Sequence, residues 1–504
     1  AVNRGEAEKI LTVSVEAPVE QIIRYLEKQI IVNDNPVTTP VLKETIADSY
    51  DRLIAPAVER EVRNMLTEKA EDGAISVFGK NLRQLLMQPP IAGKVVLGWD
   101  PAFRTGCKLA IVDPTGKVLD TKVIYPTAPQ FKVNEAKAEL KKLIDKYNVE
   151  LISVGNGTAS RESEAVIVEL LKEINKPVQY IIVNEAGASV YSASKLATEE
   201  FPNFDVGQRS AASIARRLQD PLAELVKIDP KSIGVGQYQH DMNQKKLGET
   251  LGGVVEDCVN SVGVDLNTAS VSLLEYISGV SKTIAKNIVE YREENGKFTS
   301  RAQLLKVPKL GPKAYEQCAG FMRILDGKNP LDATSVHPES YKAAEELIKK
   351  LGFEKGQVVN IRKAGSNENA MFKLMAGKLD KVKAAKELEI GEITLTDILK
   401  ELEKPARDPR EDMPKPVLRS DILEMKDLKP GMILKGTVRN VIDFGVFVDI
   451  GVHQDGLVHI SQICDRYIKH PLEAVSVGDV VDVQVMSVDT VKKRIALTMK
   501  IQKS

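Results

Sequence analysis

The stretch that decides the fold lies at residues 94–113 and reads "KVVLGWDPAFRTGCKLAIVD". It contains an apolar run that ends in Asp100, a short turn, and a second apolar run. Short apolar runs bounded by turn residues are typical of buried β-strands. The turn "DPTG" at 113–116 and a third such run follow, so the sequence predicts three strands in hairpin order.

Helical and strand patterns alternate after these three strands. Such an order predicts a mixed sheet with helices on its faces, and it resembles the ribonuclease-H-like fold. Actin-like ATPases and sugar kinases begin in a similar way, but the second glycine-rich phosphate-binding hairpin of that fold is not found in the sequence. The expected strands are 95–99, 107–112, 117–124, 149–154 and 178–183, and the expected helices are 134–147, 160–174 and 209–226.

Size and composition limit what the chain can be. It has 504 residues, which suggests roughly three to five compact units, and no apolar stretch approaches the ~18 residues that span a bilayer. Lys and Arg total 70, as do Asp and Glu, so any nucleic-acid binding must come from local surfaces. The four cysteines lie far apart, which favours neither a disulfide framework nor a zinc site and fits a reducing cytoplasm.

The expected fold class is multidomain and mostly α, with one ribonuclease-H-like α/β domain and a C-terminal all-β OB-fold barrel. A segment rich in proline and charge, "EKPARDPREDMPKPVLRS" at 403–420, is expected to be a semi-extended linker. The expected parts are a helical region (1–93), the α/β domain (94–228), a connector (229–253), a tandem helix-hairpin-helix (254–326), a helical domain (327–402), the linker (403–427) and the barrel (428–504).

Three acids are candidates for catalysis in the α/β domain. Ribonuclease-H-like nucleases need three or four carboxylates around two divalent ions, so Mg²⁺ or Mn²⁺ is expected only if this site cleaves nucleic acid. Asp100 ends the first strand, Glu185 follows another strand, and Asp220 lies in the last helix. The central strand ends without an acid, at Gly155 and Asn156, which weighs against a working nuclease. The alternatives are that these acids cap turns or form ion pairs, or that this face only binds nucleic acid.

The central strand runs into a turn, "GNGTASRE" at 155–162, that leads into a helix. Exposed backbone amides at such a turn can bind an anion. Thr158 or Ser160 could instead cap the helix, and the turn lacks the pattern of a P-loop.

Two segments repeat a helix, a short hairpin and a second helix: 273–292, "LLEYISGVSKTIAKNIVEYR", and 304–324, "LLKVPKLGPKAYEQCAGFMRI". They resemble the tandem helix-hairpin-helix module that binds a phosphate backbone without reading sequence. We expect the hairpin glycines to allow tight turns whose amides face outward, with nearby lysines adding positive charge. A packing role without any ligand is the alternative. Ser281 replaces the usual second glycine of the first hairpin, which makes the second hairpin the stronger candidate. The residues concerned are Gly279, Lys282, Gly311 and Lys313.

The C-terminal segment, including "DFGVFV" at 443–448, resembles the OB-fold RNA-binding domain first known from a ribosomal protein. Aromatic rings can stack on the bases of a single strand whatever their identity, while cations bind the backbone. A bulge at Gly445 is expected to place both phenylalanines on one surface, although a small barrel also needs aromatic core residues. The expected binding residues are Phe444, Phe447, His459, Lys493 and Arg494.

Together with the run "GVGQYQHDMNQKKL" at 234–247, these segments resemble the Tex family of bacterial transcription accessory proteins over nearly the whole chain. The resemblance implies a YqgF-type α/β domain and an architecture similar to a eukaryotic elongation factor that accompanies RNA polymerase. It implies a factor that binds single-stranded RNA and DNA, has no required cofactor and no membrane contact, and has RNA polymerase as a candidate partner. It also implies a further N-terminal helical region, which we expect to be missing because the chain opens at Ala1.

Overall fold

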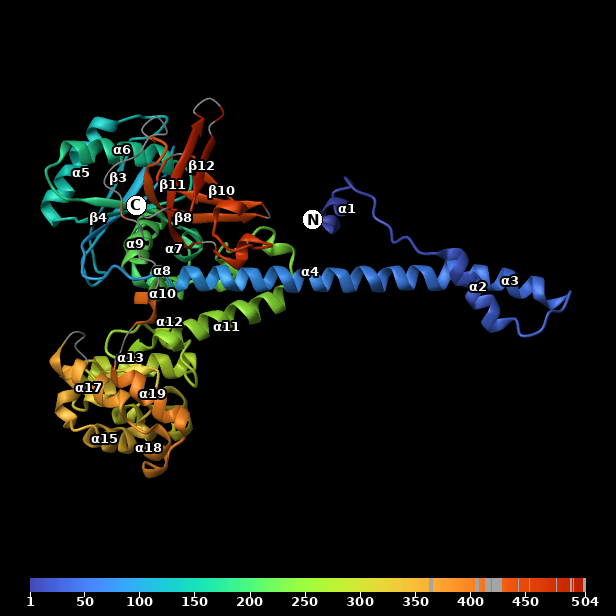
Figure 1. Cartoon of the computed structure of the whole chain (residues 1–504). Helices are drawn as coiled ribbons and strands as arrows, with labels where there is room; N and C mark the ends of the chain where they lie inside the picture. Colours follow the sequence, from blue (N-terminus) through green and yellow to red (C-terminus); the bar gives the residue numbers. More distant parts are fainter. Residues whose placement is uncertain are drawn as a thin grey trace. The chain divides into compact units, whose positions relative to one another are not determined.

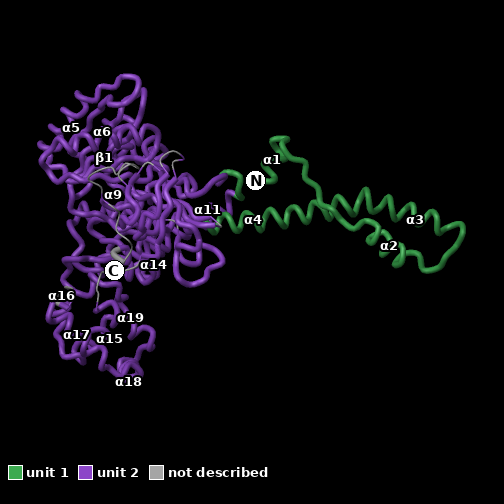
Figure 2. The backbone as a smooth tube through the Cα atoms, turned by 45° about the horizontal axis from the view of Figure 1, so that its top comes forward, with its two compact units in different colours: residues 1–77, 240–243 green, residues 78–239, 244–504 purple. Residues whose placement is uncertain are grey.

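The computed structural model describes residues 1–361, 366–403, 408–412, 418, 428–442, 444–452, 454–476, 478–489, 492 and 494–501. These residues form two compact units, shown in different colours in Figure 2. The first comprises 1–77 and 240–243, and the second comprises 78–239 and 244–504. All the candidate site residues named above belong to the second unit.

The first unit is helical. The sequence pattern predicts one amphipathic helix over about 40–70; the structure has an α-helix, a wide π turn and a second α-helix in direct succession. A π turn accommodates one extra residue in a continuous helix, so the apolar spacing shifts there. The elements are α1 (Val2–Ala7), α2 (Val19–Ile30), α3 (Thr38–Ser49), η1 (Tyr50–Ile54) and α4 (Ala55–Leu86), whose residues from Phe78 onward belong to the second unit.

The second unit contains the expected mixed sheet, which includes β3 and β4 in Figure 1. Its strand order is β3-β2-β1-β4-β5. The first three strands pair antiparallel, and β1, β4 and β5 pair parallel, which confirms the ribonuclease-H-like order. The strands are β1 (Val96–Asp100), β2 (Cys107–Val112), β3 (Val118–Ile124), β4 (Leu151–Gly155) and β5 (Gln179–Val183).

Helices cover both faces of this sheet. Leu97 and Trp99 are fully buried in a core that includes residues of α5 (Val133–Tyr147) and α6 (Ser160–Glu173). The opposite face packs against α9 (Val206–Gln219), and Gly98 makes this close approach possible because a Cβ there would overlap with the Ala211 carbonyl oxygen. The short helices α7 (Ala188–Ser192) and α8 (Lys195–Glu200) precede α9.

The expected helix over 209–226 is interrupted. α9 ends at Gln219, and α10 (Pro221–Leu225) begins directly after Asp220. Asp220 is extended (φ −151°), and its side chain accepts a hydrogen bond from the Ala223 N–H as the N-cap of α10. Pro221 at the first position of α10 lacks an N–H and cannot continue the hydrogen bonds of α9.

The next part of the second unit is built of helices with one two-stranded parallel sheet. The short strands β6 (Val264–Asp265) and β7 (Met322–Arg323) bracket the two hairpins. The helices are α11 (Gln244–Val262), α12 (Val271–Leu274), α13 (Lys282–Asn295) and α14 (Pro312–Cys318), with 3₁₀ turns η2 (Pro230–Ser232), η3 (Gln239–Asp241, shared between the units) and η4 (Arg301–Lys306).

The helices that follow have a core of their own. Fully buried Leu331, Leu347, Phe372 and Leu395 belong to it. Its elements are η5 (Pro330–Ala333), η6 (Pro338–Ser340), α15 (Tyr341–Lys350), η7 (Lys355–Gln357), α16 (Val358–Ile361), α17 (Asn367–Gly377), α18 (Lys381–Glu387) and α19 (Glu392–Glu403).

Part of the expected linker is packed. The turn η8 (Pro409–Asp412) holds Arg410, which is only 4% exposed. Its guanidinium donates to the carboxylates of Asp408 and Asp220. This packing differs from the semi-extended linker that the sequence predicts. It is possible because Asp408 and Asp220, which are far apart from one another in the sequence, compensate the buried charge of Arg410.

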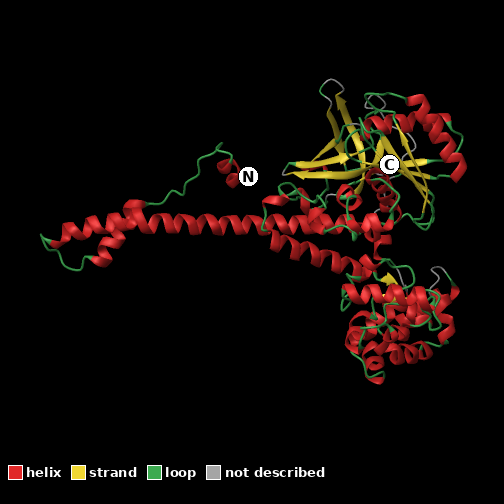
Figure 3. Cartoon of the chain, turned by 180° about the vertical axis from the view of Figure 1, so that it is seen from behind, coloured by secondary structure: helices red, strands yellow, loops and turns green. Residues whose placement is uncertain are grey.

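Five strands close into a barrel in the order β10-β12-β11-β8-β9, which confirms the all-β C-terminal domain. Strands are concentrated in this barrel and in the mixed sheet (Figure 3). None of the helices in the described part of the chain is long and apolar enough to cross a membrane. The elements are β8 (Ile433–Ile442), β9 (Gly445–Asp449), β10 (Gly456–His459), β11 (Val480–Asp489) and β12 (Arg494–Thr498), with η10 (Ile460–Gln462) and η11 (Pro471–Glu473).

Candidate nucleic-acid interface

The outer face of the barrel brings three predicted residues onto neighbouring strands. Val446, Val448 and Val458 are fully buried, so the alternating residues of β9 and β10 point outward. Phe447 on β9 lies opposite Leu457 on β10, and both side chains are half-buried.

Strand β12 extends this face on the other side of β10. Ala496 pairs with Leu457, and Arg494 lies two residues earlier on the same side of β12. Arg494 and His459 are both exposed. With a rise of about 3.3 Å per residue, they lie roughly 13 Å apart along the strands, with Phe447 between their levels. We call Phe447, His459 and Arg494 the barrel face.

Phe444 adjoins one end of the barrel face. It lies in the turn before β9 and is 53% exposed. Its carbonyl accepts a hydrogen bond of 2.8 Å from the Ile460 N–H, next to His459. The His459 ring is oriented by Ser461, whose hydroxyl lies 2.8 Å from Nδ1. An exposed aromatic ring and an imidazole therefore lie at the same end of the barrel.

The predicted bulge at Gly445 is wrong. Gly445 is in register with both Ile442 and His459, and the irregular pairing lies between Val438 and Asn440 on β8. Phe444 is exposed because it precedes the strand, where the alternation of side chains does not apply. Glycine is required at 445 because a Cβ would overlap with the Val458 carbonyl oxygen.

The structure adds residues that the sequence reasoning missed. Asn440 pairs with Phe447 and is exposed, so an amide flanks the barrel face on β8. Tyr467, in the loop after η10, is 88% exposed. The signal in the sequence that could have found Asn440 and Tyr467 is their residue type, an amide and an aromatic ring within this domain. Lys493 lies outside the described residues.

The first hairpin joins α12 to α13. Gly279 has a left-handed backbone (φ +78°), which glycine adopts without strain. Ser281 is the N-cap of α13, and its hydroxyl accepts from the Ile284 N–H. Since Ser281 has φ −78°, no glycine is required at that position, and the departure from the family pattern costs the fold nothing. Lys282 opens the helix, 73% exposed and 4.0 Å from a Glu275 oxygen.

The second hairpin differs from the expectation. Its left-handed residue is Lys309 (φ +66°), whereas Gly311 is the N-cap of α14 with φ −79°. Gly311 therefore corresponds to Ser281, not to Gly279. Lys309 and Lys313 are exposed, and a Cβ on Gly311 would meet nothing within 4 Å, so the approach to this backbone is open.

A hydrogen bond joins the two hairpins. The Asn287 amide, on α13, donates a hydrogen bond of 2.7 Å to the Pro308 carbonyl in the second hairpin. Lys282 and Lys286 of the first hairpin and Lys306, Lys309 and Lys313 of the second are all exposed.

Asp100 and Glu185 approach one another in the α/β domain. Burial raises the pKa of Asp100, while the Ser210 hydroxyl and the Lys108 ammonium oppose that rise. Burial also raises the pKa of Glu185, and the negative charge of Asp100 adds to this effect. Two carboxylates thus share the site, at a cost for ionising both.

The glycine turn predicted as an anion site receives the carboxylate of Glu185. A Cβ on Gly155 or on Gly157 would overlap with that carboxylate, so these glycines make room for it. The Gly157 N–H lowers the pKa of Glu185, against the larger effect of burial. Neither Thr158 nor Ser160 caps α6, whose N-cap is the left-handed Ala159. The turn therefore holds a side chain of the protein, whose Oε2 is buried without a hydrogen-bond partner among the described residues.

The remaining positions around this site hold no further acid. The side-chain oxygen of Asn156 accepts from the Glu185 N–H at 3.1 Å. Ser210 occupies the position on α9 that faces Asp100. Arg217 donates to the carbonyls of Asn184 (2.9 Å) and Ala186 (2.8 Å), and burial lowers its pKa to about 10.

Asp220 does not belong to this site. It lies ten residues beyond Ser210 on the chain, about 15 Å along a helix, and its carboxylate accepts from Arg410 at 2.6 Å. It pairs through its side chain with neither Arg216 nor Arg217; only its backbone N–H donates to the Arg216 carbonyl.

These donors do not fit a two-metal centre. Asp100 and Glu185 are two carboxylates where such a centre needs three or four, and the Asn156 oxygen is already an acceptor for backbone. Among the residues described, no three His, Cys, Asp or Glu side chains are grouped so as to hold a metal ion. We derive no hydrolytic step from this site.

Comparisons with known proteins agree with this architecture. Models of four domain families match the chain. They are "Tex protein YqgF-like domain" (94–219), "Helix-hairpin-helix motif" (259–323), "HHH domain" (329–410) and "S1 RNA binding domain" (427–500).

Similar proteins match over almost the whole chain. Bacillus subtilis YdcI is 57% identical over 99% of this chain and 68% of its own length. The Neisseria gonorrhoeae "Transcriptional accessory protein Tex" is 48% identical over 99% and 65%. The human "S1 RNA-binding domain-containing protein 1" is 39% identical over 99% and 56%. The chain thus spans roughly two thirds of the length of its bacterial relatives, and it belongs to the Tex family, with a YqgF-like domain, helix-hairpin-helix modules and an S1 RNA-binding domain.

Proposed function

We propose that this chain is an accessory factor of transcription that binds single-stranded RNA and DNA with little sequence preference. The observation that supports this most strongly is the barrel face, where a ring, an imidazole and a guanidinium lie on neighbouring strands. A face about 13 Å long accommodates a few nucleotides.

Low selectivity follows from the chemistry of that face. Stacking on Phe444 and Phe447 uses the π-face that every base has and contributes about 1–3 kcal/mol per base. Arg494 supplies charge for phosphates. Asn440, which pairs with Phe447, is a polar group on these strands that could read a base edge.

The hairpins are proposed as a second contact, to the phosphate backbone. Their five exposed lysines lie in or next to two tight turns, and α13 presents its N-terminal amides beside Ser281. Such contacts fix position without reading sequence.

The α/β domain is proposed as a scaffold without nuclease activity, and no cofactor is part of the proposal. RNA polymerase is the proposed protein partner, and the cytoplasm is the proposed location. The name of the gonococcal relative supports the proposed role in transcription, and the match to the S1 RNA-binding family supports the proposed binding of nucleic acid.

The test is binding of a fluorescently labelled single strand to the unmodified chain and to Phe447→Ala/His459→Ala at physiological salt. Loss of one stacked base weakens binding by about tenfold to a hundredfold. Tyr25→Ala is the matched control, because Tyr25 is a 62% exposed ring in the first unit. Equal affinity of the double variant and the unmodified chain would refute the role of the barrel face.

A second assay addresses nuclease activity. Labelled single-stranded, duplex and junction substrates are incubated with Mg²⁺ or Mn²⁺ and the unmodified chain or Asp100→Asn. We expect intact, shifted substrate with both proteins. Cleavage that disappears in Asp100→Asn would make the chain an enzyme.

A further inference from the structure

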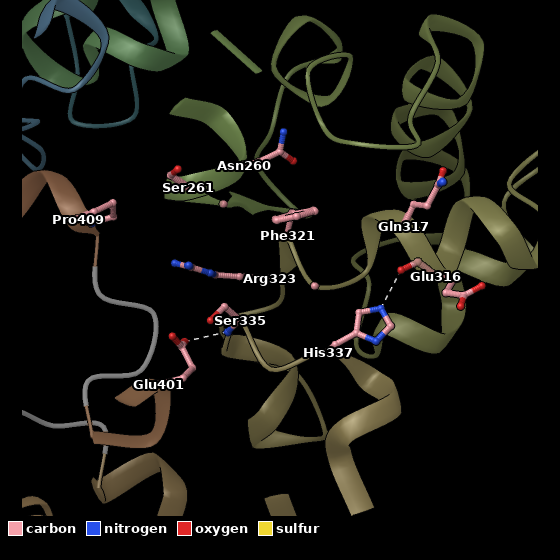
Figure 4. Close-up of a pocket in the computed structure, with 12 residues that line it drawn as sticks. Asn260, Ser261, Glu316, Gln317, Phe321, Arg323, Ser335, His337, Glu401 and Pro409 are labelled. Carbon is pink, nitrogen blue, oxygen red and sulfur yellow. Dashed lines mark hydrogen bonds between the residues drawn. The ribbon is translucent and has the colours of Figure 1, made fainter. Parts of the chain in front are cut away.

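A cavity of about 490 Å³ lies beside the first hairpin (Figure 4). Its walls come from the end of α11, from α14, from β7 and from the loop before η6. The residues that matter here are Asn260, Ser261, Gln317, Arg323, Ser335 and Glu401. In Figure 4, Arg323 extends into the space between Ser261 and Glu401.

The position of Arg323 is fixed by backbone. Its carbonyl accepts a hydrogen bond of 2.9 Å from the Leu266 N–H, next to the pairing of β6 with β7. The guanidinium lies over Gly263, where a Cβ would come within 3.0 Å of Nε. Gly263 is left-handed (φ +73°) and ends α11, so the helix terminus and the room for the guanidinium depend on one glycine.

One nitrogen of the Arg323 guanidinium lacks a hydrogen-bond partner among the described residues. This nitrogen is the buried Nε. Nearby Arg301 shows the contrast, because its guanidinium donates to the carbonyls of Met322, Val336 and Thr334 and to the Tyr341 hydroxyl. Arg323 as a whole is half-buried, and a buried guanidinium nitrogen without a partner at the edge of a cavity is a free donor that an anion in the cavity can accept from.

The neighbouring carboxylates do not supply that anion. Burial lowers the pKa of Arg323, and the attraction of Glu401 and Asp408 does not offset this effect. Glu401 accepts from the Ser335 N–H at 2.8 Å, and Asp408 accepts from Arg410. Both carboxylates thus already accept hydrogen bonds from other groups.

The cavity is joined to the first hairpin. The Asn260 side chain accepts from the Ser278 N–H and donates to the Tyr276 carbonyl. Gln317 touches the hairpin itself, because a Cβ on Gly279 would lie 2.7 Å from the Gln317 Cβ. The cavity therefore adjoins the first hairpin through Asn260 and Gln317.

We propose that this cavity binds a phosphoryl group through the guanidinium of Arg323. Arginine presents planar paired donors that match phosphate oxygens, and the Ser261 hydroxyl and the Gln317 amide line the same cavity. The phosphoryl group is either a backbone phosphate of a strand held on the hairpin, a source that rests on the proposed function, or a free phosphate. The negative charge of Glu401 repels the bound anion and so lowers its affinity for the cavity.

The test uses the full chain in two arms with the variants Arg323→Gln and Glu401→Gln. In the first arm, inorganic phosphate and pyrophosphate are titrated and followed by ³¹P NMR. We expect binding to weaken at least about tenfold in Arg323→Gln. We expect it to strengthen in Glu401→Gln, whose amide oxygen can still accept from Ser335. Arg24→Gln, at an exposed position in the first unit, is the control.

In the second arm, affinity for a labelled single strand is measured over a salt series. If a backbone phosphate lies in the cavity, Arg323→Gln lowers the slope of log affinity against log salt concentration by about 0.7. If that slope is unchanged but binding of inorganic phosphate is lost, the site is one for free phosphate. Absence of phosphate binding by the unmodified chain together with an unchanged slope would overturn the proposal. A chain that binds no strand at all refutes the proposed function, while the first arm still decides on the cavity.

Discussion

The side-chain oxygen of Asn156 accepts a hydrogen bond of 3.1 Å from the backbone N–H of Glu185 and so ties together the ends of β4 and β5. A nuclease of this fold would be expected to use an acid at that point. Here the side chain supports the loop that carries Glu185, whose carboxylate in turn fills the glycine turn after β4. At this point the Asn156 and Glu185 side chains thus take part in the packing of the domain.

Asn156→Asp tests this arrangement. The new carboxylate can still accept from the Glu185 N–H, but it adds a third negative charge beside Asp100 and Glu185. We expect a loss of roughly 1 kcal/mol, or about 2–4 °C in Tm, at pH ~8, and a smaller loss at pH ~5. Thermal unfolding at both values measures this. Asn184→Asp, at an exposed position of the next loop, is the control, and we expect it to leave Tm unchanged at both pH values.

The pH dependence of stability provides a second prediction. The folded-state pKa of Glu185 lies above its unfolded value, so its ionisation costs stability as pH rises through that interval. Glu185→Gln should therefore gain stability relative to the unmodified chain as pH rises above about 4.5 and lose that gain at lower pH. Urea unfolding across pH measures the difference.

Asp113 is the matched comparison of opposite sign. Although burial opposes it, hydrogen bonds from Thr115 and Lys117 hold the pKa of Asp113 below its usual value. Its stabilising contribution is present above the unfolded pKa and is lost as pH falls through the folded one. Asp113→Asn should thus be less stable than the unmodified chain near neutral pH and approach it in acid. If the stability differences of Glu185→Gln and Asp113→Asn changed with pH in the same direction, the opposite signs assigned to the two pKa shifts would be contradicted.

Substituting Asp220 and substituting Arg410, which form an ion pair, should change the stability of the chain by different amounts. Arg410 is 4% exposed, and Asp408 and Asp220 hold its pKa above the usual range, against burial. Asp220→Asn leaves the buried guanidinium with Asp408 alone. Arg410→Gln removes the buried charge and leaves Asp220, whose side chain is 41% exposed, in contact with water.

We therefore expect Asp220→Asn to destabilise the chain by about 1–2 kcal/mol, below the range for a fully buried pair because Asp220 is partly solvated. Proteolysis within the segment around Arg410 should accelerate in the same variant. Unchanged cleavage and unchanged Tm would show that the pair does not hold this segment in place. Asp229→Asn, which removes the charge of an exposed N-cap while its amide oxygen can still accept the capping hydrogen bond, controls for loss of a carboxylate.

Arg301 and Arg323 should respond oppositely to the same substitution. Arg301 is 1% exposed and donates four hydrogen bonds, so Arg301→Gln leaves several buried acceptors unpaired and should cost about 3–5 kcal/mol. Arg323→Gln removes a half-buried cation whose Nε has no hydrogen-bond partner among the described residues, so Tm should stay or rise. A drop in Tm as large as that of Arg301→Gln would indicate a structural role for Arg323.

The two hairpin glycines offer a further test. Gly279→Ala introduces a Cβ at φ +78° and 2.7 Å from Gln317, so we expect a loss of more than about 1 kcal/mol. Gly311→Ala places its Cβ in open space at an ordinary φ, so the fold should be unaffected. Circular dichroism on heating measures both. Equal destabilisation would contradict the assignment of Lys309, not Gly311, as the left-handed residue of the second hairpin.

The sequence by itself determined the order of the domains and most elements within them. Apolar runs, glycine turns and alternation depend on local spacing, so β1 to β5 and the barrel could be predicted from them. Phe447, His459 and Arg494 could also be proposed, because each lies in a segment typical of the S1 domain.

Only the tertiary structure decided how distant residues meet. It separated Asp220 from Asp100 and Glu185, because a proline ends α9 and Arg410 binds the carboxylate from 190 positions away. It showed that the side chain that fills the glycine turn is Glu185, and, among the described residues, it left the Arg323 Nε without a hydrogen-bond partner while satisfying the Arg301 guanidinium. Such contacts depend on long-range packing and on where charges lose their water, and no spacing along the chain encodes them.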